Sequence, residues 1–229
     1  MNHVSIDAPV LRDVELSPVP RLNTPTASAS LRGRVSLGVA AVRRLTAEQA
    51  AQGDEEWLDF LESESAHSDY LLLSLVCAFR PSDNDDPFVD AGLGIRLEAP
   101  DEPADRQPIA WSIAPKKRLA PGGGVGGRIA LTAKLAIIES TLDVTPNQQQ
   151  EQLFLVGMGE RDSDPEWRFK ATSSVPLIGD ETLTVVVKAP TGATVRAHVS
   201  VAATVRQRRL GLIPYRAELP PALRTIDLQ

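Results

Sequence analysis

The chain has 229 residues, of which 42% are hydrophobic and 24% are charged, and its formal net charge at pH 7 is −6. This composition fits a globular protein with one large or two small domains, and it excludes collagen, a coiled coil, a disulfide scaffold and wholesale disorder. Aromatic residues make up only 4% of the chain, so aliphatic side chains must fill most of the core.

Three features of the sequence bear on the cellular compartment. The single cysteine, Cys77, cannot form an internal disulfide, so the chain lacks the signature of an oxidising compartment. The first residues do not show a basic stretch followed by an apolar one, so we expect no signal peptide. No apolar run is long enough for a membrane-spanning helix. We therefore expect a cytoplasmic protein without a membrane span.

Residues 1–30 contain four prolines and end in a run of small polar residues. Proline interrupts hydrogen-bond ladders and small polar residues bury little apolar surface, so this segment is predicted to be an extended N-terminal arm. Docking of its apolar side chains on a sheet edge and a loosely ordered terminus are the two alternatives. Residues 31–229 are then expected to form a β-rich globular domain that includes a helix near residues 47–64.

The first part of this domain predicts a strand followed by a helix. Apolar residues alternate along the segment 31–44, which is typical of a half-buried strand, and they are Val35, Leu37, Val39 and Ala41. Thr46, with Gln49 three residues later, forms a capping-box pattern. We therefore expect the main helix to begin there and to extend to about residue 64, with Gly53 as the position at which it would break.

The predicted helix has one apolar face. Trp57 and Phe60 share this face and are expected to pack the helix onto a sheet, with a protein-binding helix as the alternative. The remaining positions are largely acidic: Asp54, Glu55, Glu56, Asp59 and Glu62.

From residue 69 onward the chain has the pattern of strands. The apolar run 70–79 predicts a strand buried on both faces, and the turn residues at 81–87 followed by alternation over 89–97 predict a hairpin. Further strands are expected at 109–113, 129–137, 152–158, 167–171, 183–188, 195–205 and 210–219. About nine or ten strands with one helix, and no regular strand–helix alternation, predict a mainly β fold that is an antiparallel β-sandwich or an open barrel.

Charge is distributed unevenly along the chain. Residues 45–105 contain 16 acidic and two basic residues, so this region has a net charge of −14. The rest of the chain contains 22 basic and 14 acidic residues, so its net charge is +8. Three interpretations stand: the two regions neutralise each other within the fold, copies associate head to tail, or one face binds an external charged partner. The overall acidity argues against nucleic acid as the partner.

This charge pattern leads to our first functional hypothesis, a non-catalytic protein-binding or assembly module that acts through oppositely charged surfaces. It predicts salt-sensitive association with a protein partner or with a second copy. The candidate partner-binding residues are basic ones in the C-terminal strands and acidic ones in the helix: Arg196, Arg206, Arg208, Arg209, Glu55, Glu56 and Asp59.

Two acidic loops support alternative functions. Calcium prefers several carboxylate oxygens, and loops at one end of a sandwich can converge on such an ion, although the same residue types are also good turn formers. The alternatives are a β-sandwich hydrolase that uses loop carboxylates and a calcium-dependent surface or lipid binder. The candidate residues are Asp83, Asp85, Asp86, Asp162 and Asp164.

No other motif points to a cofactor or a reaction. Gly122, Gly124 and Gly127 match GxGxxG in form, but period-two alternation follows them where a dinucleotide site needs a helix. The three histidines and Cys77 lack metal-ligand spacing, and no nucleophile-elbow sequence occurs. We therefore expect no cofactor, with calcium as the alternative, and favour a protein without catalytic chemistry of its own.

Overall fold

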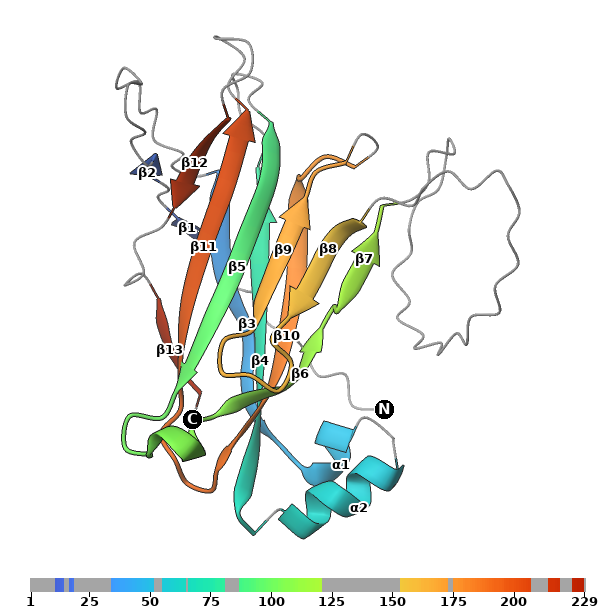
Figure 1. Ribbon diagram of the computed structural model, residues 1–229, viewed down its shortest axis with the longest axis vertical. Coiled ribbons are helices and arrows are strands. Elements are labelled where there is room, and N and C mark those ends of the chain that lie inside the picture. Colours follow the sequence, from blue (N-terminus) through green and yellow to red (C-terminus); the bar gives the residue numbers. More distant parts are fainter. Residues whose placement is uncertain are drawn as a thin grey trace, which may run out of the picture.

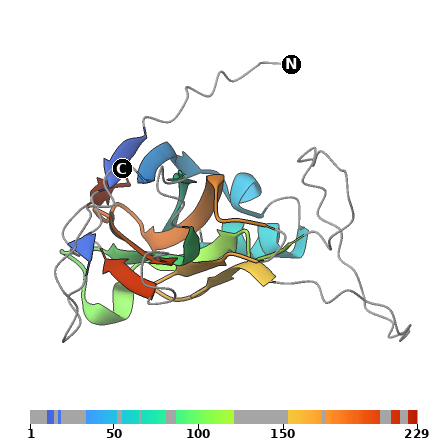
Figure 2. The ribbon, with the colours of Figure 1, turned by 90° about the horizontal axis from the view of Figure 1, so that it is seen from above.

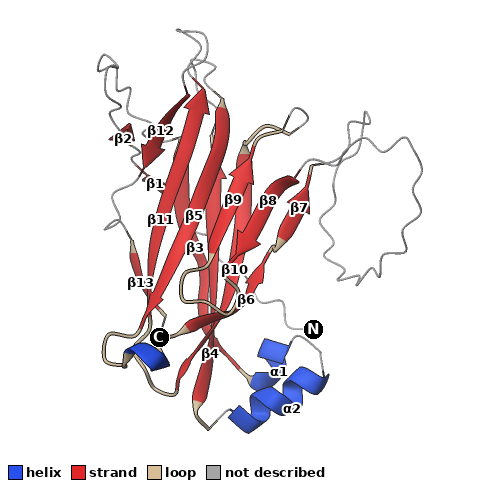
Figure 3. Cartoon of the chain, in the orientation of Figure 1, coloured by secondary structure: helices blue, strands red, loops and turns tan. Residues whose placement is uncertain are grey.

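Two antiparallel β-sheets pack face to face, and the helices gather at one end of them (Figures 1 and 3). The structure is a computed structural model that describes residues 11–14, 17–18, 34–51, 55–64, 66–80, 87–120, 153–172, 175–206, 214–218 and 224–228. Figure 2, a view from above, shows the two layers of strands. The predicted antiparallel β-sandwich is therefore confirmed.

Sheet A has five strands in the order β1-β3-β4-β10-β6. Their bounds are β1 (Arg12–Val14), β3 (Val35–Leu45), β4 (Ser68–Phe79), β10 (Gly179–Pro190) and β6 (Ile109–Ala114). β4 lies at the centre and is buried on both faces along most of its length, as the apolar run 70–79 predicted.

Sheet B has eight strands, seven of them in the order β2-β12-β11-β5-β9-β8-β7, and β13 also pairs with β11. Their bounds are β2 (Ser17–Pro18), β12 (Pro214–Glu218), β11 (Arg196–Arg206), β5 (Phe88–Glu98), β9 (Glu166–Lys170), β8 (Leu153–Met158), β7 (Lys117–Leu119) and β13 (Thr225–Asp227). A single turn of 3₁₀-helix, η1 (Ala104–Arg106), lies in the connection from β5 to β6.

The main core fills the space between the sheets. Along β11 every second residue from Val195 to Val205 is buried, in agreement with the alternation seen in the sequence. Trp167 of β9 is completely buried in this core, and its indole Nε1 donates a hydrogen bond to the carbonyl oxygen of Pro115 at 3.0 Å. The one polar atom of this large side chain is therefore satisfied.

Two helices, α1 (Ala47–Ala51) and α2 (Glu55–Glu64), occupy the region where one helix was expected. The predicted capping box is confirmed at the start of α1. Thr46 Oγ1 accepts a hydrogen bond from the Gln49 N–H, and Gln49 Oε1 accepts one from the Thr46 N–H, both at 3.2 Å. Gly53 falls within residues 52–54, which lie outside the described residues.

The predicted hairpin between the strands at 70–79 and 89–97 is wrong. β4 belongs to sheet A, whereas β5 belongs to sheet B and pairs with β9 and β11. A strand at the centre of a sheet has a neighbour on each side, and β3 and β10 take the two edges of β4. The chain therefore crosses from one sheet to the other between Arg80 and Pro87.

The predicted apolar face of β3 also changes halfway along the strand. Val35 and Leu37 face the core as expected, but the pairing of β3 with β4 shifts register between Val39 and Ala41. Val42, instead of Ala41, then packs against the core. An extra residue at a β-bulge moves the side chains that follow it to the other face of the strand.

Two parts of the N-terminal segment are described, and each pairs with one sheet. β1 pairs with β3 at an edge of sheet A, and β2 pairs with β12 in sheet B. Asp13 in β1 accepts hydrogen bonds from the Ser36 hydroxyl at 2.7 Å and from the Arg80 guanidinium at 2.8 Å. These two bonds, with that from Ser36 contributing most, lower the pKa of the Asp13 carboxyl.

Some predicted elements fall where the structure describes no residues. The glycine-rich loop with Gly122, Gly124 and Gly127 and the strand expected at 129–137 lie within residues 121–150, outside the described ranges. Within those ranges no helix has the length and apolar character needed to cross a membrane.

Candidate functional site

α2 packs on the outer face of sheet A, at what we name the helical end of the sandwich (Figure 3). Leu61 is completely buried there, in a second and smaller cluster beneath the helices. The cluster also contains Tyr70 of β4 and Val186 of β10, whose side chains point away from the main core. Burial of one apolar face, with polar residues on the other, fixes how α2 lies on the sheet.

Two aromatic side chains of α2 stand at the border between this cluster and the solvent. Trp57 is 41% exposed and Phe60 is 40% exposed, and their rings meet edge to face with centroids 5.8 Å apart. Both also contact Trp111 of β6: Trp57 edge to face at 5.4 Å, and Phe60 with nearly parallel rings at 5.8 Å. These contacts confirm that Trp57 and Phe60 pack the helix onto a sheet, and each ring keeps part of its surface exposed.

An arginine from a distant part of the chain completes the aromatic group. Arg161 lies in the loop between β8 and β9, and its guanidinium carbon is 3.3 Å from the ring centroid of Trp111 and 5.1 Å from that of Trp57. Arg161 has a positive φ of 70°, which is uncommon for a residue other than glycine. A hydrogen bond of 2.7 Å from its backbone N–H to the carbonyl oxygen of Ala110 in β6 holds the loop in place.

Beneath the rings lie an ion pair and a tyrosine. Lys188 of β10 forms an ion pair with Glu64 of α2, and its Nζ is 5.1 Å from the centroid of Trp111. Tyr70 is 3% exposed, and its buried hydroxyl has no hydrogen-bond partner among the described residues. Burial and, to a smaller extent, the Glu64 carboxylate raise the pKa of Tyr70 to about 12, and the guanidinium of Arg161 opposes them.

The sequence of α2 is strongly acidic. The helix contains five acidic residues and no basic one: Glu55, Glu56, Asp59, Glu62 and Glu64. Glu62 and Glu64 lie in the last turn, where the negative end of the helix dipole disfavours a carboxylate. Asp59 is exposed, whereas the side chains of Glu55 and Glu56 lie outside the described residues. We name the exposed side chains of Trp57, Asp59 and Phe60, together with Arg161, the α2 patch.

The basic candidates in the C-terminal strands lie elsewhere. Arg196 is exposed at the start of β11 and forms an ion pair of 3.5 Å with Asp227. β11 runs away from the helical end (Figure 1), so its last residue, Arg206, lies about 33 Å farther on at roughly 3.3 Å per residue. The side chain of Arg206 is not among those described, and Arg208 and Arg209 fall in the undescribed segment 207–213.

The described ion pairs show how far the opposite charges neutralise each other. One of them joins the acidic region 45–105 to the C-terminal strands, Glu98 with His198 at 2.9 Å, and it is ionic only when the histidine is protonated. Other acidic residues of the region pair outside those strands: Asp69 with Arg44, Glu102 with Arg106, and Glu64 with Lys188. Asp59, Asp101 and Asp105 are exposed and form no ion pair within the described part of the chain. Asp59 lies on α2, and Asp101 and Asp105 lie in the connection that contains η1, on the other side of the same end (Figure 1). These carboxylates are therefore not neutralised by the C-terminal strands.

The two acidic loops proposed as a calcium or catalytic site adjoin β5 at different positions along the strand. Asp162 and Asp164 lie in the loop between β8 and β9, which hydrogen-bonds along the second half of β5, at Ile95 and Leu97. Asp83, Asp85 and Asp86 lie within residues 81–86, outside the described ranges, and the residue that follows them, Pro87, leads into the opposite end of β5. No group of three or more potential metal ligands is found among the described residues.

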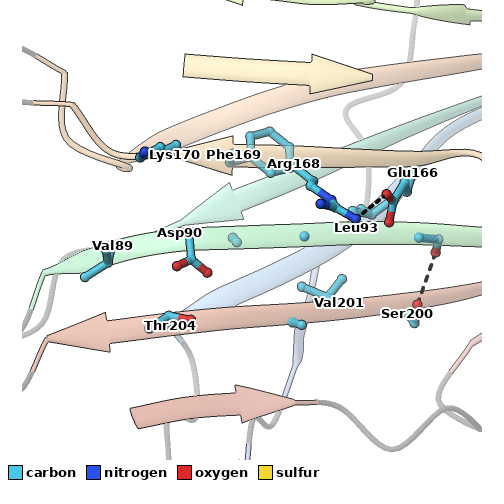
Figure 4. Close-up of a pocket in the computed structure, with 14 residues that line it drawn as sticks. Val89, Asp90, Leu93, Glu166, Arg168, Phe169, Lys170, Ser200, Val201 and Thr204 are labelled. Carbon is cyan, nitrogen blue, oxygen red and sulfur yellow. Dashed lines mark hydrogen bonds and ion pairs between the residues drawn. The ribbon is translucent and has the colours of Figure 1, made fainter. Parts of the chain in front are cut away.

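A shallow groove of about 790 Å³ crosses the outer face of sheet B (Figure 4). Its floor includes Gly92 and Gly94 of β5, which leave open space between the side chains of β9 and β11. On one side Arg168 forms an ion pair with Glu166 at 2.8 Å, and on the other Ser200 donates a hydrogen bond to the carbonyl oxygen of Gly94 at 3.4 Å. Asp90, Lys170 and Thr204 also line the groove, but nothing in the described structure brings their side chains together into a site.

Sequence reasoning placed Trp57 and Phe60 correctly but missed Trp111 and Arg161. Trp111 was assigned only to a strand and Arg161 to a connection, because two residues that lie 50 positions apart in sequence give no local pattern. No known protein family matches this chain, and none of the curated proteins matches its sequence. The functional argument therefore depends on the surface itself.

Proposed function

We propose that this chain is a non-catalytic protein-binding module, and that the helical end is the surface with which it binds. The observation that carries the proposal is that three exposed carboxylates at this end, Asp59 on α2 and Asp101 and Asp105 beside η1, form no ion pair within the described part of the chain. The hypothesis drawn from the sequence named an acidic and a basic surface, and these carboxylates support the acidic one.

The physical reason is that charge without an ion-pair partner acts beyond its immediate neighbours, and at this end the three carboxylates outnumber the exposed guanidinium groups of Arg43 and Arg161, which form no ion pair within the described ranges either. Such charge attracts a partner of opposite charge over a distance of about 8–10 Å at moderate ionic strength and orients it before contact. Nucleic acids and anionic membrane surfaces are repelled by the same charge. A protein with a basic surface is therefore the partner class that this end favours. We place the module in the cytoplasm, because its one cysteine offers no disulfide to an oxidising compartment.

The experiment is a pair of binding measurements on the full chain. Light scattering at low and high salt measures whether copies associate, and calorimetric titration with an arginine-rich or a glutamate-rich peptide measures the preference for a basic partner. We expect the arginine-rich peptide to bind at low salt, and its affinity to fall as salt rises. The glutamate-rich peptide serves as the control and should not bind.

Two outcomes would contradict the proposal. One is a monomer at every salt concentration that binds neither peptide. The other is equal binding of both peptides, because a surface that does not distinguish the sign of its ligand is not acting through its carboxylates.

A further inference from the structure

We infer that the α2 patch is a symmetric contact between two copies of this chain, in which the rings of Trp57 and Phe60 meet their counterparts across a twofold axis. Asp59 of each copy then pairs with Arg161 of the other. The inference goes beyond the proposed function, because it assigns a second copy to the α2 patch and leaves the two exposed carboxylates beside η1 to a basic partner. The contact also differs from the head-to-tail association considered from the sequence.

The first observation is the exposed aromatic surface. In a chain with 4% aromatic residues, Trp57 and Phe60 stand three residues apart on one helix and are 41% and 40% exposed. Both rings contact Trp111 of β6, so they lose little freedom when another surface packs on them. Aromatic side chains that a contact covers at its centre are among the residues that dominate protein–protein binding energy.

The second observation is that the patch carries one charge of each sign without an ion-pair partner. Asp59 and the Arg161 guanidinium form no ion pair within the described ranges. Asp162, next to Arg161, turns its carboxylate to the Ser163 N–H and accepts a hydrogen bond of 2.7 Å from it. Because the carboxylate of Asp59 and the guanidinium of Arg161 offset each other, the α2 patch by itself suits neither a strongly basic nor a strongly acidic surface.

The third observation is where these two charges lie. At about 100° per residue, Asp59 lies about 100° around α2 from Phe60 and about 160° from Trp57. The Arg161 guanidinium lies on the side of the rings that faces β6, because it is 5.1 Å from the centroid of Trp57 and its backbone is hydrogen-bonded to Ala110 of β6. The two exposed rings therefore stand between a negative group and a positive one.

A surface with this order of groups is complementary to itself. In a twofold contact, any residue that meets a second residue of the other copy is met in the same way by that residue's counterpart. The rotation therefore brings rings onto rings at the centre and a carboxylate onto a guanidinium at each edge. A partner of different sequence needs a matching surface of its own, whereas a second copy supplies one by symmetry.

The size and charge of the contact set its strength. The patch presents four side chains per copy, against roughly 20–30 residues a side in a standard interface, so we expect a weak dimer that forms at high micromolar concentration. Two chains of net charge −6 also repel each other. Added salt screens this repulsion as well as the two ion pairs, so dimer affinity should change by less than about threefold with salt. Binding of the arginine-rich peptide, in contrast, should weaken.

The test uses two charge reversals that the twofold contact combines in a specific way. In Asp59→Arg two arginines face each other at each edge of the contact, and in Arg161→Asp two aspartates do. Each variant alone should therefore dimerise about tenfold more weakly than the wild type in sedimentation velocity. In an equimolar mixture the heterodimer regains both ion pairs, so it should associate within about threefold of the wild-type affinity.

Two control variants and one measurement on the wild type accompany the mixture. Asp101→Arg makes the same change in net charge beside η1 and should alter dimer affinity by less than about twofold. Phe60→Ala removes one ring from each copy and should weaken the dimer about tenfold. Circular dichroism confirms that each variant is folded. In the wild type Trp57 is the most exposed tryptophan, and its quenching by acrylamide should fall as protein concentration rises.

Three results would overturn the inference. If the mixture associates no more tightly than the separate folded variants, the twofold pairing is wrong. If Asp101→Arg weakens association as much as Asp59→Arg does, the copies meet elsewhere. If the wild type stays monomeric up to millimolar concentration with unchanged quenching of Trp57, the contact does not exist.

The same measurements separate this inference from the proposed function. Binding of the arginine-rich peptide to a chain that stays monomeric would leave the proposed function standing and remove the dimer contact. Dimerisation as expected, without binding of the peptide, would remove the basic partner and leave the dimer contact.

Discussion

Replacing Leu61 by alanine tests whether packing, and not the helix propensity of α2, holds the α2 patch in position. Leu61 is completely buried in the cluster beneath the helices, so the change removes three buried carbon atoms and leaves a cavity. At about 0.8 kcal/mol per buried methylene the transfer contribution is about 2.4 kcal/mol, and the cavity adds to it. Because the cluster is small and can partly relax, we expect the free energy of unfolding to fall by about 3 kcal/mol.

Urea unfolding followed by circular dichroism measures this loss, and Ile178→Ala is the control. Ile178 is 55% exposed, so its truncation should change the free energy of unfolding by less than about 0.5 kcal/mol. If α2 detaches before the sheets unfold, part of the effect will appear as faster amide exchange within the helix. A loss below about 1 kcal/mol with unchanged exchange in α2 would refute the packing argument.

Three further changes test other parts of the fold. Gly157→Ala places a Cβ atom 2.7 Å from the Pro115 carbonyl oxygen, so we expect a loss of about 1–3 kcal/mol in urea unfolding; an unchanged midpoint would contradict the contact. Cys77 is completely buried and burial raises its pKa to about 12, so a thiol reagent should modify it in urea but not in the native protein, and rapid native labelling would refute its burial. The hydrogen bond from Ser36 lowers the pKa of Asp13, so the stability due to this carboxylate is present above its ordinary pKa and is lost as the pH falls through the lowered one. Asp13→Asn should therefore lower the melting temperature near neutral pH and approach the wild type in strong acid, whereas a pH-independent difference would contradict the assignment.

The features that could be predicted from the sequence are those set by neighbouring residues. The capping box at Thr46 and Gln49 and the alternation from Val195 to Val205 each depend on positions a few residues apart, and both appear in the structure. Period-two stretches with turn residues between them predicted an antiparallel sandwich or an open barrel, and the structure shows the sandwich.

The features that could not be predicted depend on which segments meet across the chain. The hairpin expected between β4 and β5 failed because adjacency in sequence does not decide which edge a strand pairs with. The bulge between Val39 and Ala41 is a property of the β3–β4 pair, and nothing in β3 alone marks it. A shift of one residue is enough to change which side chains reach the core.

The candidate site also has some features that could be predicted from the sequence and others that could not. The acidic sequence of α2 and the shared face of Trp57 and Phe60 are local patterns, and they pointed to this helix. The stacking of Arg161 on Trp111 required the loop between β8 and β9 to lie against β6, through hydrogen bonds that involve Ala110. A non-local contact of this kind leaves no pattern in either segment.

The most direct test of a binding surface at the helical end is amide chemical-shift mapping of the full chain during titration with the arginine-rich peptide. Our account predicts saturable shifts at Asp59, Asp101 and Asp105, which weaken together as salt is added. Shifts centred on the outer face of sheet B around Gly92 and Gly94, with the helical end unchanged at saturation, would contradict it.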